Sequence, residues 1–256
     1  MRCELRQGRW QAALADVGEV DAVVVDAPYS ARTHGGHCDG VALAKTNYMR
    51  ACGQPDYNYN RRAIEYDRMT ADDVRAFVAH WSPRCRGWFA TLTDDVLFPV
   101  WREALADTGR CTFSTVPCVI TGMTVRLAGD GPSSWATMLC VARPRSRAFA
   151  SWGTLPGAYV VPAEKTVAVG GKPLTLMRQI IRDYTRPGDL VVDACAGGGT
   201  TLIAAYQMGR HSVGAELDPA TYAKATARIA AATRQPDLWH GTGERVRVRD
   251  AEGGLL

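Results

Sequence analysis

The chain has 256 residues, of which 46% are hydrophobic and 22% are charged, and its net charge at pH 7 is +4. These values are typical of a soluble globular protein, and the length suits one α/β domain with a substantial core. No stretch approaches the roughly 20 apolar residues of a membrane helix, so we expect no membrane association. A mildly basic chain is compatible with a nucleic-acid partner, but this charge alone does not predict one.

The cysteines and the N-terminus indicate the compartment. Eight cysteines are scattered along the chain without a C-x-x-C pair, and the first residues, MRCELRQGRW, lack the apolar run of a secretion signal. Reduced thiols are the default for such a chain. We therefore expect a cytoplasmic protein.

The N-terminal third contains one clear strand and one long irregular segment. A short helix is expected over residues 11–18, followed by Asp21–Val25, an apolar run suited to a buried parallel strand. Residues 30–62 are rich in Gly, His, Asn, Tyr and Arg and show no periodicity. A loop of this length inside a compact domain is usually functional or disordered, and its aromatic and cationic residues favour function.

The middle of the chain alternates helices and strands. Thr70 and Asp73 form the pattern of a capping box, which predicts that a helix starts there. The elements expected next are a strand at Trp88–Leu92, a helix at Phe98–Ala106, and strands at Cys111–Val116 and Ala136–Ala142 that pair antiparallel.

The C-terminal third carries the pattern of a nucleoside-cofactor site. An amphipathic helix at Leu174–Tyr184 precedes the strand Leu190–Val192, a turn with three glycines, a helix beginning near Thr200 and the strand Ser212–Ala215. Glycine lets the backbone approach a ligand, a helix N-terminus attracts anions, and the acid that ends the second strand, Glu216, can accept both ribose hydroxyls. Glycine triplets alone more often mark turns. A nicotinamide or flavin site would need a last glycine that this turn lacks.

A second pattern, VVVDAPYS, lies at residues 23–30. It is a β-branched strand that stops at an acid, a proline and an aromatic residue, an arrangement suited to gripping a flat base. Alone, it fits equally well a buried strand with Asp26 as a helix cap and Tyr29 in the core. Beside the cofactor pattern, we favour the base clamp.

The two patterns together resemble the S-adenosylmethionine-dependent amino-methyltransferases of DNA, which act on adenine N6 or cytosine N4. Their D-P-P-Y and D-P-F-x-G-x-G-T-T motifs correspond to Asp26–Tyr29 and Asp193–Thr201, in the circularly permuted order of the β class. The resemblance implies a Rossmann-like α/β fold with a mostly parallel seven-stranded sheet and helices on both faces. It also implies one methyltransferase domain over residues 1–233, with the loop 30–62 as a DNA-contacting insertion and residues 234–256 as a tail. A second helix is expected at Ala220–Ala232.

The resemblance assigns roles residue by residue. The catalytic clamp would consist of Asp26, Ala27, Pro28 and Tyr29. S-adenosylmethionine would be bound by Lys172, Asp193, Ala194, Cys195, Gly197, Gly199, Thr200, Thr201, Glu216 and Asp218. DNA, the expected partner, would be contacted by Arg32, Lys45, Arg50, Arg61 and Arg62. The class is often dimeric, so a homodimer stays open, and no metal is expected.

Several positions depart from the family pattern. Ala27 and Ala194 replace prolines, Cys195 replaces a phenylalanine, and residues 168–171 keep none of the family's His-Pro-Thr-Gln. Arg9 stands where many members have an acid that holds the cofactor adenine. RNA or cytosine-N4 methylation, and a catalytically silent DNA-binding protein, therefore stay open as alternatives, although Asp rather than Ser at position 26 favours adenine N6.

The sequence also contains candidate residues for two further chemistries. Methylation at the 5-carbon of cytosine needs a nucleophilic cysteine, and Cys118 follows a proline, but its apolar surroundings predict a core residue. Zinc could be surrounded by His34, His37, Cys38 and Cys52, yet their spacing is poor for a tetrahedral site. We expect these four to be solvated loop residues.

Overall fold

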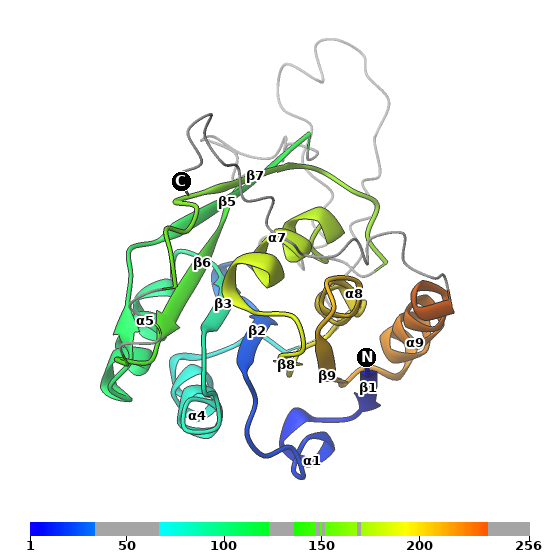
Figure 1. Cartoon of the computed structure of the whole chain (residues 1–256), viewed down its shortest axis with the longest axis horizontal. Coiled ribbons are helices and arrows are strands. Elements are labelled where there is room, and N and C mark those ends of the chain that lie inside the picture. Colours follow the sequence, from blue (N-terminus) through cyan, green and yellow to red (C-terminus); the bar gives the residue numbers. More distant parts are fainter. Residues whose placement is uncertain (34–66, 123–135, 147–148, 150–151, 168–169, 235–256) are drawn as a thin grey trace, which may run out of the picture.

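The computed structural model describes residues 1–33, 67–122, 136–146, 149, 152–167 and 170–234. These residues form one nine-stranded sheet, in the order β1-β9-β8-β2-β3-β6-β5-β7, with β4 paired to β6 (Figure 1). Its strands are β1 Cys3–Gln7, β2 Ala22–Asp26, β3 Phe89–Thr93, β4 Cys111–Thr112, β5 Val116–Thr121, β6 Ala136–Arg143, β7 Tyr159–Pro162, β8 Leu190–Asp193 and β9 His211–Glu216. All pairs are parallel except those that β6 makes with β3, β4 and β5. The mostly parallel α/β fold is confirmed, with two strands more than the expected seven.

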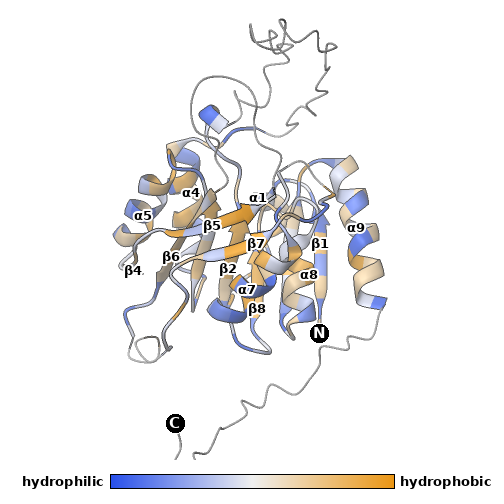
Figure 2. Cartoon of the chain, turned by 90° about the horizontal axis from the view of Figure 1, so that it is seen from above, coloured by the Kyte–Doolittle hydropathy of each residue, from blue (hydrophilic) through white to orange (hydrophobic). Residues whose placement is uncertain are grey.

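Helices cover both faces of the sheet (Figure 1). One face carries α1 Trp10–Ala13, α4 Ala71–Trp81 and α5 Phe98–Asp107, and the other carries α7 Leu174–Tyr184, α8 Thr200–Gln207 and α9 Pro219–Arg234. Val23 and Val25 of β2 pack towards α4 and α5, whereas Ala22 and Val24 pack towards α7. Alternate residues of a strand point to opposite faces, so a strand covered on both sides must be apolar throughout. Figure 2 shows hydrophobic colour concentrated in the central strands.

Most helices and strands lie where the sequence patterns predicted them. Where the structure differs from those predictions, there is a physical reason. The capping box of α4 is present, with the Thr70 backbone N–H bonded to Asp73 at 2.9 Å. The helix expected over residues 11–18 is only the four-residue α1, which ends in turns. The strand expected at Cys111–Val116 is wrong as one unit. It divides into β4 and β5, both antiparallel to β6.

Two strands, β1 and β7, escaped the sequence analysis because they are short and lie at the ends of the sheet. In β1 only Cys3 and Leu5 pack against the α8–α9 cluster. In β7 Tyr159 and Val161 are buried while Val160 is exposed. Among the described helices, none combines the length and apolar character that crossing a bilayer requires.

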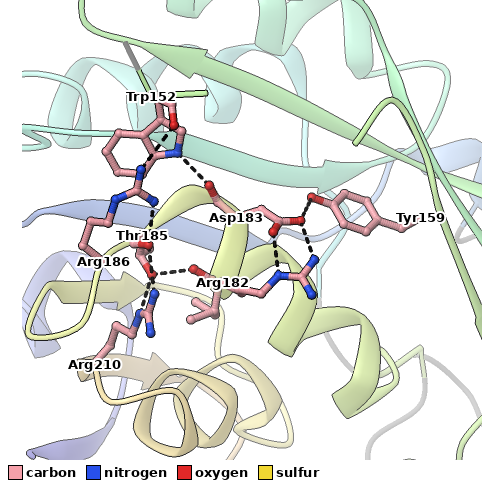
Figure 3. A network of polar contacts seen from close by, with 8 residues as sticks. Trp152, Tyr159, Arg182, Asp183, Thr185, Arg186 and Arg210 are labelled. Carbon is pink, nitrogen blue, oxygen red and sulfur yellow. Dashed lines mark hydrogen bonds and ion pairs between the residues drawn. The ribbon is translucent and has the colours of Figure 1, made fainter. Parts of the chain in front are cut away.

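A polar network joins Trp152 and Tyr159 to the end of α7 (Figure 3). The indole N–H of Trp152 donates to the carbonyl of Asp183 at 2.8 Å, and the hydroxyl of Tyr159 donates to the Asp183 carboxylate at 2.8 Å. Arg186 stacks on the Trp152 ring with its guanidinium carbon 3.5 Å from the ring centroid. Since α7 leads directly into β8, this network lies at the amino ends of the parallel strands, away from their carboxyl ends.

Candidate functional site

Three acids lie at the carboxyl ends of three neighbouring strands. β2 pairs with β8 through Ala22–Val191 and Val23–Val192, and the two strands end at Asp26 and Asp193. β9 lies on the other side of β8 and ends at Glu216. The carboxyl edge of an open parallel sheet is where such folds bind their ligands. The two motifs at opposite ends of the sequence therefore meet at one edge.

Asp26 is held by a lysine from the loop before α7. The ammonium of Lys172 donates to Asp26 Oδ2 at 2.9 Å and to the carbonyl of Gly170 at 3.0 Å. The side chain of Lys172 is 9% exposed and that of Asp26 is 23% exposed. Burial opposes the charged form of Lys172, but the interactions of Lys172 with Asp26 and Tyr29 together outweigh burial and raise the lysine pKa. Asp26 thus makes an ion pair rather than the helix cap considered from its sequence.

Tyr29 is held at its hydroxyl and on one face of its ring. Its hydroxyl lies 2.6 Å from Thr137 Oγ1, and Thr137 donates to the carbonyl of Thr93 at 3.0 Å, so Thr137 accepts from the tyrosine. The ammonium of Lys172 lies 4.9 Å from the ring centroid. Burial raises the pKa of the phenol, which therefore stays neutral. Of the two remaining clamp residues, Ala27 is buried and Pro28 is half-buried.

The glycine turn begins at a buried carboxyl. Asp193 is 1% exposed, and its Oδ1 accepts from the backbone N–H of Cys195 at 3.0 Å. Burial, together with the negative charges of Asp26 and Glu216, raises the pKa of Asp193 to about 7. The same burial and charges raise the pKa of the Cys195 thiol. The three strand ends are therefore close enough to act on one another electrostatically.

Glu216 supports the turn from β9. Its Oε2 accepts from the backbone N–H of Gly197 and its Oε1 from that of Asp218, both at 2.8 Å. Burial raises the pKa of Glu216, and the hydrogen bonds from these two amides offset part of that rise. Asp218 itself caps α9, since its Oδ2 accepts from the backbone N–H of Thr221 at 2.6 Å.

Two glycines of the turn need a left-handed backbone. Gly197 has φ +50° with open space where a Cβ would lie, which leaves room for a ligand beside the turn. Gly199 has φ +74° and is the N-cap of α8, where a Cβ would lie 3.0 Å from Ile229 Cδ1. Thr200 and Thr201 follow as the first, buried residues of α8, and Ala194 is buried at the start of the turn.

The charges around the glycine turn suit a cationic nucleoside cofactor. Within the described residues, no ion pair involves Asp193 or Glu216. Two partly or fully buried carboxyls without a cation favour a ligand that brings positive charge. S-adenosylmethionine, with its sulfonium and ammonium groups and its ribose hydroxyls, fits that donor set.

Most of the expected DNA contacts lie outside the described residues. Arg32 is exposed and pairs with Asp95 at 2.6 Å. The other four, Lys45, Arg50, Arg61 and Arg62, fall in residues 34–66, as do His34, His37, Cys38 and Cys52. The described residues hold no group of three or more His, Cys, Asp or Glu side chains that could bind a metal ion.

Three supporting residues were missed by the sequence analysis. Asp94, 9% exposed, accepts from the backbone N–H and hydroxyl of Ser30 at 2.9 and 2.5 Å, and from the hydroxyl of Thr33 at 2.7 Å. Glu164 caps α7 by accepting from its first two amides at 2.8 and 3.1 Å. Arg228 of α9 donates to the Gly198 carbonyl at 2.9 Å. Of the three, only Asp94 could have been noticed in the sequence, because it is an acid between an expected strand and an expected helix.

Cys118 is a core residue, as its sequence predicted. It is fully buried on β5, and burial raises the pKa of its thiol to about 12. A thiol with that pKa is a poor nucleophile at neutral pH. The 5-carbon chemistry therefore has no support in this residue.

Comparisons with known proteins support the resemblance to the adenine-N6/cytosine-N4 amino-methyltransferases. A protein-family model described as DNA methylase matches residues 159–227, which span β7 to the first half of α9. The type II methyltransferase M.HindIII of Haemophilus influenzae is 37% identical over 70 residues, which are 27% of this chain and only 23% of that protein.

Solved structures extend the likeness to the whole fold. The M1.HpyAVI–SAM complex has a TM-score of 0.61 at 18% identity, over 88% of this chain and 98% of the other. The cytosine-N4-specific PvuII DNA methyltransferase has a TM-score of 0.54 at 12% identity, over 91% and 92% of the two chains. At these identities the likeness establishes the Rossmann-like fold.

Proposed function

We propose that this chain, whose cofactor half matches a DNA methylase model, transfers a methyl group from S-adenosylmethionine to the exocyclic amine of a base in DNA. One observation carries the proposal: Asp26 and the glycine turn from Asp193 to Gly199 lie at the carboxyl ends of adjacent parallel strands. A carboxylate for the amine and a cradle for the methyl donor are thereby side by side. The likeness to the M1.HpyAVI–SAM complex supports the choice of cofactor.

The cofactor half would hold S-adenosylmethionine through two groups of contacts. The turn from Asp193 to Gly199 would surround the methionine part, and Glu216 would accept the ribose hydroxyls. When bound, S-adenosylmethionine supplies an electrophilic methyl group on a sulfonium. Buried carboxyls such as Asp193 offset the positive charge of that group.

The base half would activate the amine. The lone pair of an exocyclic amine is delocalised into the ring, which makes the nitrogen a weak nucleophile. The Asp26 carboxylate and the carbonyl of Ala27 would each accept a hydrogen bond from one of the two amine N–H groups. These bonds would draw the nitrogen towards tetrahedral geometry and free the lone pair. As the N–C bond forms and the S–C bond breaks, positive charge grows on the nitrogen, and the Asp26 carboxylate stabilises it. The surplus proton leaves the amine after transfer.

A base inside a duplex cannot reach this edge, so it must swing out of the helix. Tyr29 would stack on the extruded base, an interaction worth about 1–3 kcal/mol. Its hydroxyl is anchored on Thr137, so the ring is already oriented before the base arrives.

Adenine N6 is the proposed target, because aspartate at position 26 matches the adenine-specific members of the resembled family. Cytosine N4 is the second candidate, and the likeness to the cytosine-N4-specific PvuII enzyme is compatible with it. RNA in place of DNA, and a DNA-binding protein without transfer activity, are the remaining alternatives. Arg9 and Ala27, which depart from the family pattern, permit the last of these.

The loop over residues 30–62 is proposed to supply much of the DNA contact. Its first turn is tied to the site by Asp94, which bonds Ser30 and Thr33. Reversing the charges of Arg61 and Arg62 should weaken DNA binding and reduce its salt slope by about two. Unchanged affinity and slope would contradict this role.

Incubation with radiolabelled S-adenosylmethionine and unmethylated DNA, followed by digestion to nucleosides, tests the function. Labelled N6-methyladenine supports the proposal, labelled N4-methylcytosine supports the second candidate, and label in RNA alone points to the RNA alternative. DNA binding without label would indicate the silent protein. Asp26→Ala should abolish transfer while cofactor affinity stays nearly intact, and a variant that still methylates would overturn the role of Asp26.

A further inference from the structure

Lys172 is a buried cation at the carboxyl edge with three partners. Its ammonium has the Asp26 carboxylate at 2.9 Å, the Gly170 carbonyl at 3.0 Å and the face of Tyr29 at 4.9 Å. Burying an ammonium is costly unless such partners surround it. Both Asp26 and Tyr29 belong to the base clamp, so the lysine serves that half of the site.

The backbone around Lys172 is also fixed. It precedes Pro173, whose φ of −54° suits a helix start, and Glu164 binds the first two amides of α7. Leu176 and Ile180 of α7 are fully buried against the sheet. The position of the ammonium relative to β2 is therefore set by packed secondary structure, rather than by a free loop.

The cofactor half makes no comparable contact with this lysine. Asp193 bonds the N–H of Cys195, and Glu216 bonds that of Gly197. Within the described residues, the one ion pair of Lys172 is with Asp26. This placement differs from the cofactor role expected from the sequence.

We propose that Lys172 is a positioning residue for the target amine. By holding Oδ2 of Asp26, it fixes the carboxylate plane and leaves Oδ1, which lies 3.4 Å from the Tyr29 hydroxyl, to accept the amine. An ammonium beside Asp26 also weakens the attraction of the carboxylate for a growing cation. In this proposal, the gain from orienting the Asp26 carboxylate exceeds the loss of its attraction for the cationic amine. The role of Lys172 rests on the proposed methyl transfer.

The variants Lys172→Met and Lys172→Arg test this role. The control is Lys165→Met, which changes an exposed lysine between β7 and α7, the same connection that holds Lys172. Cofactor affinity is measured by calorimetry, and the rate of a single turnover on unmethylated DNA is measured at saturating cofactor. For Lys172→Met we expect affinity within about threefold of wild type and a rate lower by about a hundredfold. Lys172→Arg should recover part of the rate, because it keeps a donor to Asp26.

Other results would overturn the inference. Lost cofactor affinity with an unchanged rate at saturating cofactor would make Lys172 a cofactor ligand. Unchanged affinity with an unchanged rate would mean that Lys172 does not position Asp26, and a faster rate would mean that its charge hinders transfer. If the wild type methylates no nucleic acid, the proposed function fails, and crystal structures of wild type and Lys172→Met then decide the positioning role. An Asp26 carboxylate in the same orientation in both structures would refute it, while a displaced carboxylate would support it.

Discussion

Replacing Asp193 with asparagine should remove a pH dependence from the stability of the folded chain. The pKa of this buried carboxyl is about 7, compared with about 3.9 in an unfolded chain. Because the folded state holds the proton more tightly, the wild type should lose stability as the pH rises from about 4 to about 7 and change little above that. Three pKa units correspond to about 4 kcal/mol, an upper limit for the whole change.

Asparagine resembles the protonated carboxyl in shape and keeps the acceptor for the Cys195 amide. The variant should therefore match the wild type near pH 4 and become more stable than it near pH 8, by up to about 4 kcal/mol. Urea unfolding followed by circular dichroism across this range measures the difference. Asp72→Asn, at an exposed position of α4, controls for the loss of a negative charge. Parallel profiles for wild type and Asp193→Asn would refute the reasoning.

The same carboxyl should link cofactor binding to pH. A positively charged ligand favours ionised Asp193, so affinity for S-adenosylmethionine should rise by about tenfold from pH 6 to pH 8 in the wild type. The variant should bind more weakly at pH 8 and show little dependence. Calorimetry in buffers of different ionisation enthalpy would detect the proton released on binding to the wild type alone.

Three further substitutions probe the scaffold and the chemistry. Asp94→Ala leaves the Ser30 N–H without its buried acceptor and should destabilise the fold by about 3 kcal/mol, whereas Asp95→Ala, at an exposed neighbour, should change little in the same denaturation assay. Gly199→Ala combines a strained φ with a tight contact and should cost about 2 kcal/mol, while Gly18→Ala, which meets open space, should be tolerated. Cys118→Ser should still methylate DNA in the labelling assay. Complete loss of transfer by a folded Cys118→Ser protein would instead favour a cysteine nucleophile.

The parts of the site with local signals were predictable from the sequence. β2, β8 and β9 are apolar runs that each end at an acid, and the turn after β8 carries glycines where positive φ is needed. Parallel strands covered by helices then had to bring these acids to one edge. The resemblance to a known family supplied what each acid would bind.

The missed parts depend on contacts between distant segments. Lys172 reaches Asp26 only because α7 packs on the face of the sheet next to β2, and Glu164 reaches α7 across ten residues. No local pattern encodes such distances. β1 was missed for another reason: a charged edge strand with only two partly buried apolar residues, Cys3 and Leu5, has no apolar run to detect.

The position of β2 between β3 and β8 has a consequence for synthesis of the chain. β3, its partner on one side, begins at Phe89, but β8, its partner on the other side, begins only at Leu190. On the ribosome, one side of the apolar β2 therefore has no pairing partner until most of the polypeptide has emerged. Unpaired apolar strands are where nascent proteins aggregate. Fragments that stop before Leu190 should consequently be insoluble or bound to chaperones, even though they contain the whole base clamp.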